Sequence, residues 1–142
     1  MRPMSSSKDE RETRADFAER YQARASLEIL DDVEREVIGE AWGANGFTTV
    51  AEAERLSRRL DLDTHSRLLD VGSGCGWPGL FLARQAGCEI LVTDLPTEGL
   101  EMATRRAKVE GLNFLGAVAS SARHFPFAES SLDAIVHVDV LC

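Results

Sequence analysis

One ten-residue segment constrains the fold of this chain more than any other: Asp70-Val71-Gly72-Ser73-Gly74-Cys75-Gly76-Trp77-Pro78-Gly79. A short apolar run over residues 67–71 leads into it and is typical of a buried β-strand. Pro78 favours the first turn of a helix after the glycines. Glycines between a strand and a helix permit a tight turn and let a ligand touch the main chain. The segment therefore predicts a strand–loop–helix unit that binds a ligand near the helix N-terminus.

The rest of the C-terminal half predicts alternating helices and strands. We expect helices over 79–85 and 97–110, strands over 89–93, 113–119 and 132–141, and a loop over 120–131. Gly87 and Gly111 follow the two helices and are typical of helix ends. Strands that alternate with helices at this spacing form a parallel sheet, so the fold class is α/β.

Residues 1–64 are expected to form an N-terminal helical segment, and residues 65–142 the sheet domain. Apolar residues three and four apart predict one buried stripe on a packing helix, or on two helices that break near Ser26: Phe17, Tyr21, Leu30, Val33 and Val37. Thr49 and Glu52 predict a capping box in front of a further amphipathic helix. We expect this segment to pack on the sheet domain or to cover its ligand site.

Composition excludes several classes of function. The 142 residues suffice for one domain, and 16 basic against 24 acidic residues give a net charge of −8, so nucleic-acid binding is not expected. The three cysteines form no C-x-x-C pair, which predicts no zinc site, no disulfide framework and a cytoplasmic setting. No apolar run approaches the ~20 residues of a membrane span.

Two ligand classes compete for the glycine loop. Read from Gly74, the motif matches the dinucleotide pattern G-x-G-x-x-G, whereas read from Asp70 it is D-x-G-x-G-x-G. The second interpretation fits better because Gly72 falls where the strand stops, and because the Asp70 carboxylate would repel a diphosphate but attract an ammonium group. Asp94 ends the next strand, where a carboxylate can accept hydrogen bonds from both ribose hydroxyls. The pattern favours a nucleoside with an amino-acid tail.

The run Leu68-Leu69-Asp70-Val71-Gly72-Ser73-Gly74-Cys75-Gly76, with Asp94 after it, resembles the first two motifs of class I S-adenosylmethionine-dependent methyltransferases. Residues 123–127 and 132–135 resemble a later part of the small-molecule, methyltransferase type 11-like branch. The resemblance covers about residues 65–142. It implies a Rossmann-like sheet in the order 3-2-1-4, with helices on both faces. It also implies methyl transfer from S-adenosyl-L-methionine to a small-molecule acceptor.

The resemblance assigns the methionine part of the cofactor to the glycine motif. Asp70 and the backbone at Gly72, Gly74 and Gly76 would hold it. No metal is implied.

The nucleoside part would be held by residues after the second and third strands. Asp94 would bind the ribose hydroxyls, and Leu95 would pack against adenine. The Ala122 N–H would reach the adenine ring. The family commonly has Asp before that alanine, whereas this chain has Ser121, whose hydroxyl is a weaker acceptor for the adenine amino group.

No residue stands out as a catalytic base. His137, on the fourth expected strand, is a weak candidate, and a histidine satisfied by hydrogen bonds is the simpler interpretation. Asp139 lies on the same strand face and is a candidate contact to substrate or to the cofactor ammonium. Transfer from a sulfonium depends on alignment and exclusion of water more than on a base.

Three functions stay open from the residues alone: the cofactor-binding part of a small-molecule methyltransferase, a non-catalytic nucleoside-binding module, and a fragment of a dinucleotide-binding oxidoreductase. The fourth strand would lie at a sheet edge, where an apolar strand is prone to association. We expect one of two arrangements: either the chain is a fragment of a longer protein, which we favour, or a second copy of the chain covers this edge.

Overall fold

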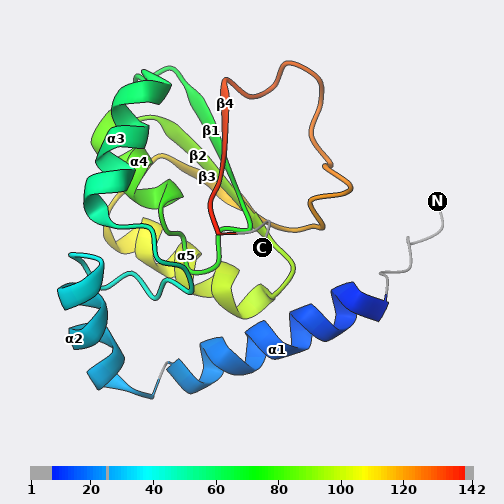
Figure 1. Ribbon diagram of the computed structural model, residues 1–142. Helices are drawn as coiled ribbons and strands as arrows, with labels where there is room; N and C mark the ends of the chain where they lie inside the picture. The colour runs from blue at the N-terminus through cyan, green and yellow to red at the C-terminus, as the bar shows by residue number, and fades with distance from the viewer. Residues whose placement is uncertain (1–7, 25, 140–142) are drawn as a thin grey trace.

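A parallel four-stranded sheet forms the centre of the structure, a computed structural model that describes residues 8–24 and 26–139 (Figure 1). The strand order is β3-β2-β1-β4, and every neighbouring pair is parallel. The elements in chain order are α1 (Lys8–Arg24), α2 (Glu28–Val37), α3 (Val50–Leu60), β1 (Arg67–Val71), α4 (Gly79–Ala86), β2 (Glu89–Asp94), α5 (Thr97–Val109), β3 (Phe114–Ala119) and β4 (Ala134–His137). The predicted α/β class and strand order are confirmed.

Local sequence signals account for the end of α4 and the start of α3. Helix α4 ends at Gly87, whose φ of 69° is left-handed, as expected for a glycine after a helix. Helix α3 begins with the predicted capping box: the Glu52 N–H donates to the Thr49 hydroxyl, and the Thr49 N–H donates to the Glu52 carboxylate. These signals act within a few residues of each other, which is why they can be found in the sequence.

The helices that follow the strands lie on one face of the sheet within the described residues. The connections β1–α4–β2 and β2–α5–β3 step in the same direction across the sheet, and right-handed crossovers then place both helices on the same side. Helix α3 packs against α4 on that side. The chain from β3 to β4 contains no helix in the part that the structure describes. The expected helices on both faces are therefore seen on one face only.

Strand β4 is shorter than the expected range 132–141. Among the described residues β4 pairs only with β1, and the ladder runs from Leu68 opposite Ala134 to Val71 opposite His137. Beyond Val71 the main chain turns into the glycine loop, so β4 has no further partner residues in β1. Asp139 then adopts a left-handed φ of 57°, which leaves the extended conformation. Residues 140–142 of the expected strand lie outside the described residues.

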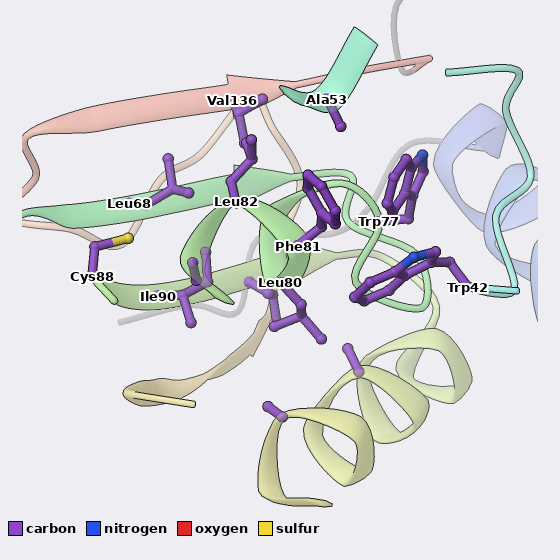
Figure 2. Packing of buried hydrophobic residues seen from close by; sticks show 14 of the residues in the cluster. Trp42, Ala53, Leu68, Trp77, Leu80, Phe81, Leu82, Cys88, Ile90 and Val136 are labelled. Carbon is purple, nitrogen blue, oxygen red and sulfur yellow. The ribbon is translucent and has the colours of Figure 1, made fainter. Parts of the chain in front are cut away.

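The core lies between the sheet and helices α3, α4 and α5 (Figure 2). Three aromatic rings gather at its edge: the Trp77 centroid is 5.1 Å from that of Trp42 and 5.4 Å from that of Phe81. The Trp77 indole N–H donates to the Thr48 carbonyl at 3.0 Å. Trp77 therefore packs against the 42–49 loop, which ties the N-terminal segment to the glycine loop.

Before α3, the N-terminal segment forms two helices that break near Ser26, as predicted, but its apolar stripe is buried only in the α1 part, where Tyr21 is 3% exposed. Val33 and Val37 on α2 are 53% and 57% exposed, while Glu34 beside them is buried. The stripe predicts the wrong buried face, because the Glu34 carboxylate accepts three main-chain hydrogen bonds that no apolar side chain could accept. Within the described ranges, no helix is both long and apolar enough to cross a membrane.

Replacing Phe81 by Ala is expected to lower the free energy of unfolding by about 3–5 kcal/mol, because it empties the centre of the aromatic group. Urea denaturation followed by circular dichroism measures the loss. Val109→Ala is the control, since Val109 is 81% exposed and its truncation should cost less than about 0.5 kcal/mol. Equal stability of the two variants would contradict the packing described here.

Candidate functional site

A cavity of about 310 Å³ opens at the carboxyl ends of the strands, where open parallel sheets bind their ligands. Its floor comes from the glycine loop and from the residues after β2, and its roof from α1 and the loop that precedes α3. The lining residues are Thr13, Phe17, Tyr21, Ala44, Asn45, Gly46, Gly72, Ser73, Gly74, Cys75, Trp77, Asp94, Leu95, Pro96, Val138 and Asp139. The volume lies at the lower end of the ~300–1,000 Å³ range of small-molecule sites.

The glycine loop is held to the end of β2 by its main chain. The N–H groups of Gly72 and Ser73 both donate to the Thr93 carbonyl, at 2.8 and 3.0 Å. Gly74 has a left-handed φ of 52°, and a β-carbon at this position would lie 2.6 Å from the Tyr21 hydroxyl oxygen. Gly74 thus satisfies both the turn and the close approach of α1.

Asp94 lies on the cavity wall and supports the loop. Its Oδ2 accepts the Gly74 N–H and its Oδ1 accepts the Leu95 N–H, each at 2.7 Å. Burial raises the pKa of the Asp94 carboxyl, and the two main-chain donors oppose that rise. Each oxygen keeps a second lone pair, so the carboxylate can still accept hydrogen bonds from a ligand.

Asp70 lies beneath the loop and does not line the cavity. It is buried, and its Oδ2 accepts the Gly79 N–H at 3.0 Å, at the start of α4. A β-carbon at Gly79 would lie 2.4 Å from that oxygen, so only glycine fits there. Burial raises the pKa of Asp70 well above its usual value, and the charge of Asp94 adds to the rise. The Asp70 carboxylate already accepts the Gly79 N–H, which is one of the donors that a diphosphate bound at the start of α4 would need.

Apart from Asp139, the remaining expected site residues fall outside the cavity. Gly76 packs under the loop, where a β-carbon would lie 2.4 Å from a methyl carbon of Leu80. The Ser121 hydroxyl donates to Glu10 of α1 at 2.6 Å, and Ala122 beside it is exposed. His137 is exposed on β4 and does not line the cavity. Of the expected residues, the structure brings Gly72, Gly74, Asp94, Leu95 and Asp139 together.

Among the cavity residues that were not expected to contact the cofactor, Ser73 and Tyr21 carry polar groups next to the glycine loop. The Ser73 side chain is 2% exposed, and its hydroxyl finds no hydrogen-bond partner among the described residues. Ser73 lies inside the glycine motif, so its place in the sequence could have indicated that it belongs to the site. Tyr21 is buried over Gly74, and burial together with Asp94 raises the pKa of its phenol. Tyr21 lies 53 residues before Gly74, and no local pattern predicts such a contact.

The cavity is acidic. Asp94 and Asp139 are its two ionisable carboxylates, and no lysine, arginine or histidine lines it within the described residues. The Thr48 hydroxyl donates to Asp139 at 3.1 Å. A low-dielectric cavity with carboxylates and no basic side chain favours a cationic ligand over a diphosphate.

The comparison with known proteins agrees with this geometry. A family model described as a methyltransferase domain matches residues 68–142, slightly more than half of the chain. The chain belongs to the class I S-adenosylmethionine-dependent methyltransferases. Within residues 8–24 and 26–139, the methyltransferase chain has no cluster of three or more His, Cys, Asp or Glu side chains that could hold a metal.

Similar proteins are longer than this methyltransferase chain. Methyltransferase GfsG of Streptomyces halstedii is 36% identical over 83 residues, which are 58% of this chain and 30% of that protein. A methyltransferase from Thiobacillus denitrificans, solved in complex with S-adenosyl-L-homocysteine, is 27% identical with a TM-score of 0.56, over 64% of this chain and 37% of the other. The [4+2]-cyclase SpnF is 28% identical with a TM-score of 0.51, over 60% and 33%. The chain spans less than a third of the length of the curated relatives it matches.

Replacing Asp70 by Asn is expected to flatten the pH dependence of stability. Because burial raises the pKa of Asp70, the folded chain binds a proton there more tightly than the unfolded chain. This tighter proton binding stabilises the folded chain. Its contribution to the free energy of unfolding is fully present below the unfolded pKa of about 3.9 and is lost as the pH rises through the folded pKa. Asparagine removes this titration, and its amide oxygen can still accept the Gly79 N–H.

Urea denaturation of both proteins from about pH 4 to about pH 8 measures this slope. The free energy of unfolding should fall less with rising pH in Asp70→Asn than in the unaltered chain. Asp16→Asn is the control, because Asp16 is exposed on α1. Parallel pH profiles for Asp70→Asn and the unaltered chain would show that the buried carboxyl does not titrate as described.

Proposed function

We propose that this chain binds S-adenosylmethionine in the acidic cavity and supplies the cofactor-binding half of an enzyme that methylates a small molecule. The observation that carries the proposal is the cavity itself: it is lined by a glycine loop and the Asp94 carboxylate, and by no lysine, arginine or histidine of the described chain. Neither a diphosphate nor another polyanion suits that combination.

The residues present fit the parts of such a cofactor. The two lining carboxylates, Asp94 and Asp139, suit a ligand with a sulfonium and an ammonium group. The buried Ser73 hydroxyl is free to bond a polar ligand group. Asp94 retains acceptor capacity for ribose hydroxyls, and Leu95 with Pro96 offers an apolar surface to a base.

When bound, S-adenosylmethionine supplies a methyl group on a cationic sulfur that is already a good leaving group. The chain then has to align the reactants and exclude water. Helix α1 contributes Phe17 and Tyr21 to the roof, and the loop before α3 contributes residues 44–46. We propose that residues 1–64 cover the site in this way, while residues 65–142 hold the cofactor.

A second function is compatible with the same site: nucleoside binding without methyl transfer. The observation that favours it is the similarity to SpnF, which is a [4+2]-cyclase. A shared fold carries different chemistries, so the fold alone does not decide between them.

Two measurements test the proposal. Calorimetry with S-adenosylhomocysteine and with NAD should show binding of the first and none of the second; the reverse result would refute the cofactor assignment. Methyl transfer by the 142-residue chain to a panel of small acceptors then separates the methyltransferase from the binding module.

Asp94→Ala should weaken S-adenosylhomocysteine binding by about 1.5–3 kcal/mol, because charge-assisted hydrogen bonds to the ligand are lost. Calorimetry measures the change. Asp94→Asn should lose less, since its remaining oxygen can still accept the Gly74 N–H. Glu89→Ala, at the opposite end of β2, is the control and should bind normally. Unchanged affinity of Asp94→Ala would mean that the carboxylate does not contact the ribose.

Gly74→Val should abolish S-adenosylhomocysteine binding, because its side chain would fill the space between the loop and Tyr21. Gly111→Val is a matched control for backbone strain. Gly111 also has a left-handed φ, of 64°, but a β-carbon there meets no atom within 4 Å among the described residues. Calorimetry should find binding only in the control. Binding by Gly74→Val would exclude the glycine loop as the ligand contact.

A further inference from the structure

Glu34 on α2 is a buried carboxylate held by three consecutive main-chain donors. Its side chain is 4% exposed. The N–H groups of Trp42, Gly43 and Ala44 each donate to it at 2.9 Å. Successive N–H groups that converge on one anion form a nest, an arrangement that fixes the local main chain. Glu34 therefore determines the shape of the loop that leads to the cavity roof.

The same carboxylate also holds α1. The Arg24 guanidinium, near the end of α1, is 15% exposed and forms an ion pair with Glu34. It makes a second, longer contact of 3.4 Å with Asp31. A buried carboxylate is costly unless charge and hydrogen bonds compensate it, and here both are present. One side chain thus joins α1, α2 and the loop after α2.

Both parts of the cavity roof extend from these anchored points. Tyr21 lies three residues before Arg24 on α1, so it is nearly one turn away on the same helix. Ala44, the last donor to Glu34, lines the cavity. Gly43 approaches Cys75 of the glycine loop so closely that a β-carbon would lie 3.2 Å from its sulfur. Displacement of Glu34 would free both parts together.

We infer that Glu34 is a positioning residue for the cofactor: it does not line the cavity itself but holds both halves of the roof over it. The inference rests on the proposed function, because it concerns how long a ligand stays beneath that roof. Loss of the Glu34 carboxylate should mainly increase the rate at which the ligand leaves.

The test compares Glu34→Gln with Asp32→Asn. The first is nearly isosteric but loses the charge and replaces one acceptor oxygen with a donor. The second neutralises an acid on the same helix whose ion pair with Arg35 is exposed, so it controls for helix charge. Release of radiolabelled S-adenosylhomocysteine is measured after dilution, and hydrogen exchange of the amides at 42–44 is measured without ligand.

Glu34→Gln should release the ligand about tenfold faster and exchange the 42–44 amides faster, whereas Asp32→Asn should match the unaltered chain. A purely structural role would lower thermal stability but leave the release rate of the folded fraction unchanged, which would overturn the inference. If Glu34→Gln does not fold, Arg24→Gln decides, since it keeps the main-chain donors on Glu34 but frees α1, and it too must release the ligand faster.

Failure of the inference and failure of the proposed function give different results. Absence of S-adenosylhomocysteine binding by the unaltered chain would refute the proposed function, and with it the role given to Glu34. Normal binding by the unaltered chain with an unchanged release rate in Glu34→Gln would refute the positioning role alone.

Discussion

The hydrogen bond from the Gly79 N–H to the Asp70 carboxylate is the contact on which the rest of the structure depends. It joins the C-terminal end of β1 to the first turn of α4 and so closes the loop between them. With both ends fixed, Gly72 and Ser73 meet the Thr93 carbonyl, and Gly74 meets Asp94. The cost is a buried carboxylate, whose charged form is disfavoured by desolvation.

The cavity above this loop belongs to two distant parts of the chain. The sheet domain contributes the glycine loop and Asp94, which nearby residues hold in place. The roof comes from α1 and the loop before α3, which the Arg24–Glu34 ion pair joins, and Trp42 packs that loop against Trp77 of the glycine loop. Polar contacts that must all form together are easier to release than a continuous apolar interface. That difference suits the proposed role of this segment as a cover that admits a ligand.

The sequence predicted best where structure is decided locally. The bounds of β1, the end of α4 at Gly87 and the Thr49 capping box follow from neighbouring residues, and the strand order follows from the family resemblance. The buried face of α2 was predicted wrongly, because an apolar stripe carries no information about the partner of Glu34. The shorter β4 depends on where β1 ends, which is also a property of a different element.

The same limit applies to the site. Gly72, Gly74, Asp94 and Leu95 line the cavity because strand ends and loops place them there. Tyr21 reaches the cavity only through the folding of α1 over the loop, so the 21–74 contact has no signature in the sequence.

The two tryptophans of the chain lie on opposite sides of the junction between roof and loop. Trp42 follows α2, Trp77 belongs to the glycine loop, and their ring centroids are 5.1 Å apart. At that distance the emission of each indole depends on the other ring and on its shielding from water. The pair is therefore an intrinsic fluorescent reporter for the proposed cover: its opening would separate the two rings and change the emitted light without any added label.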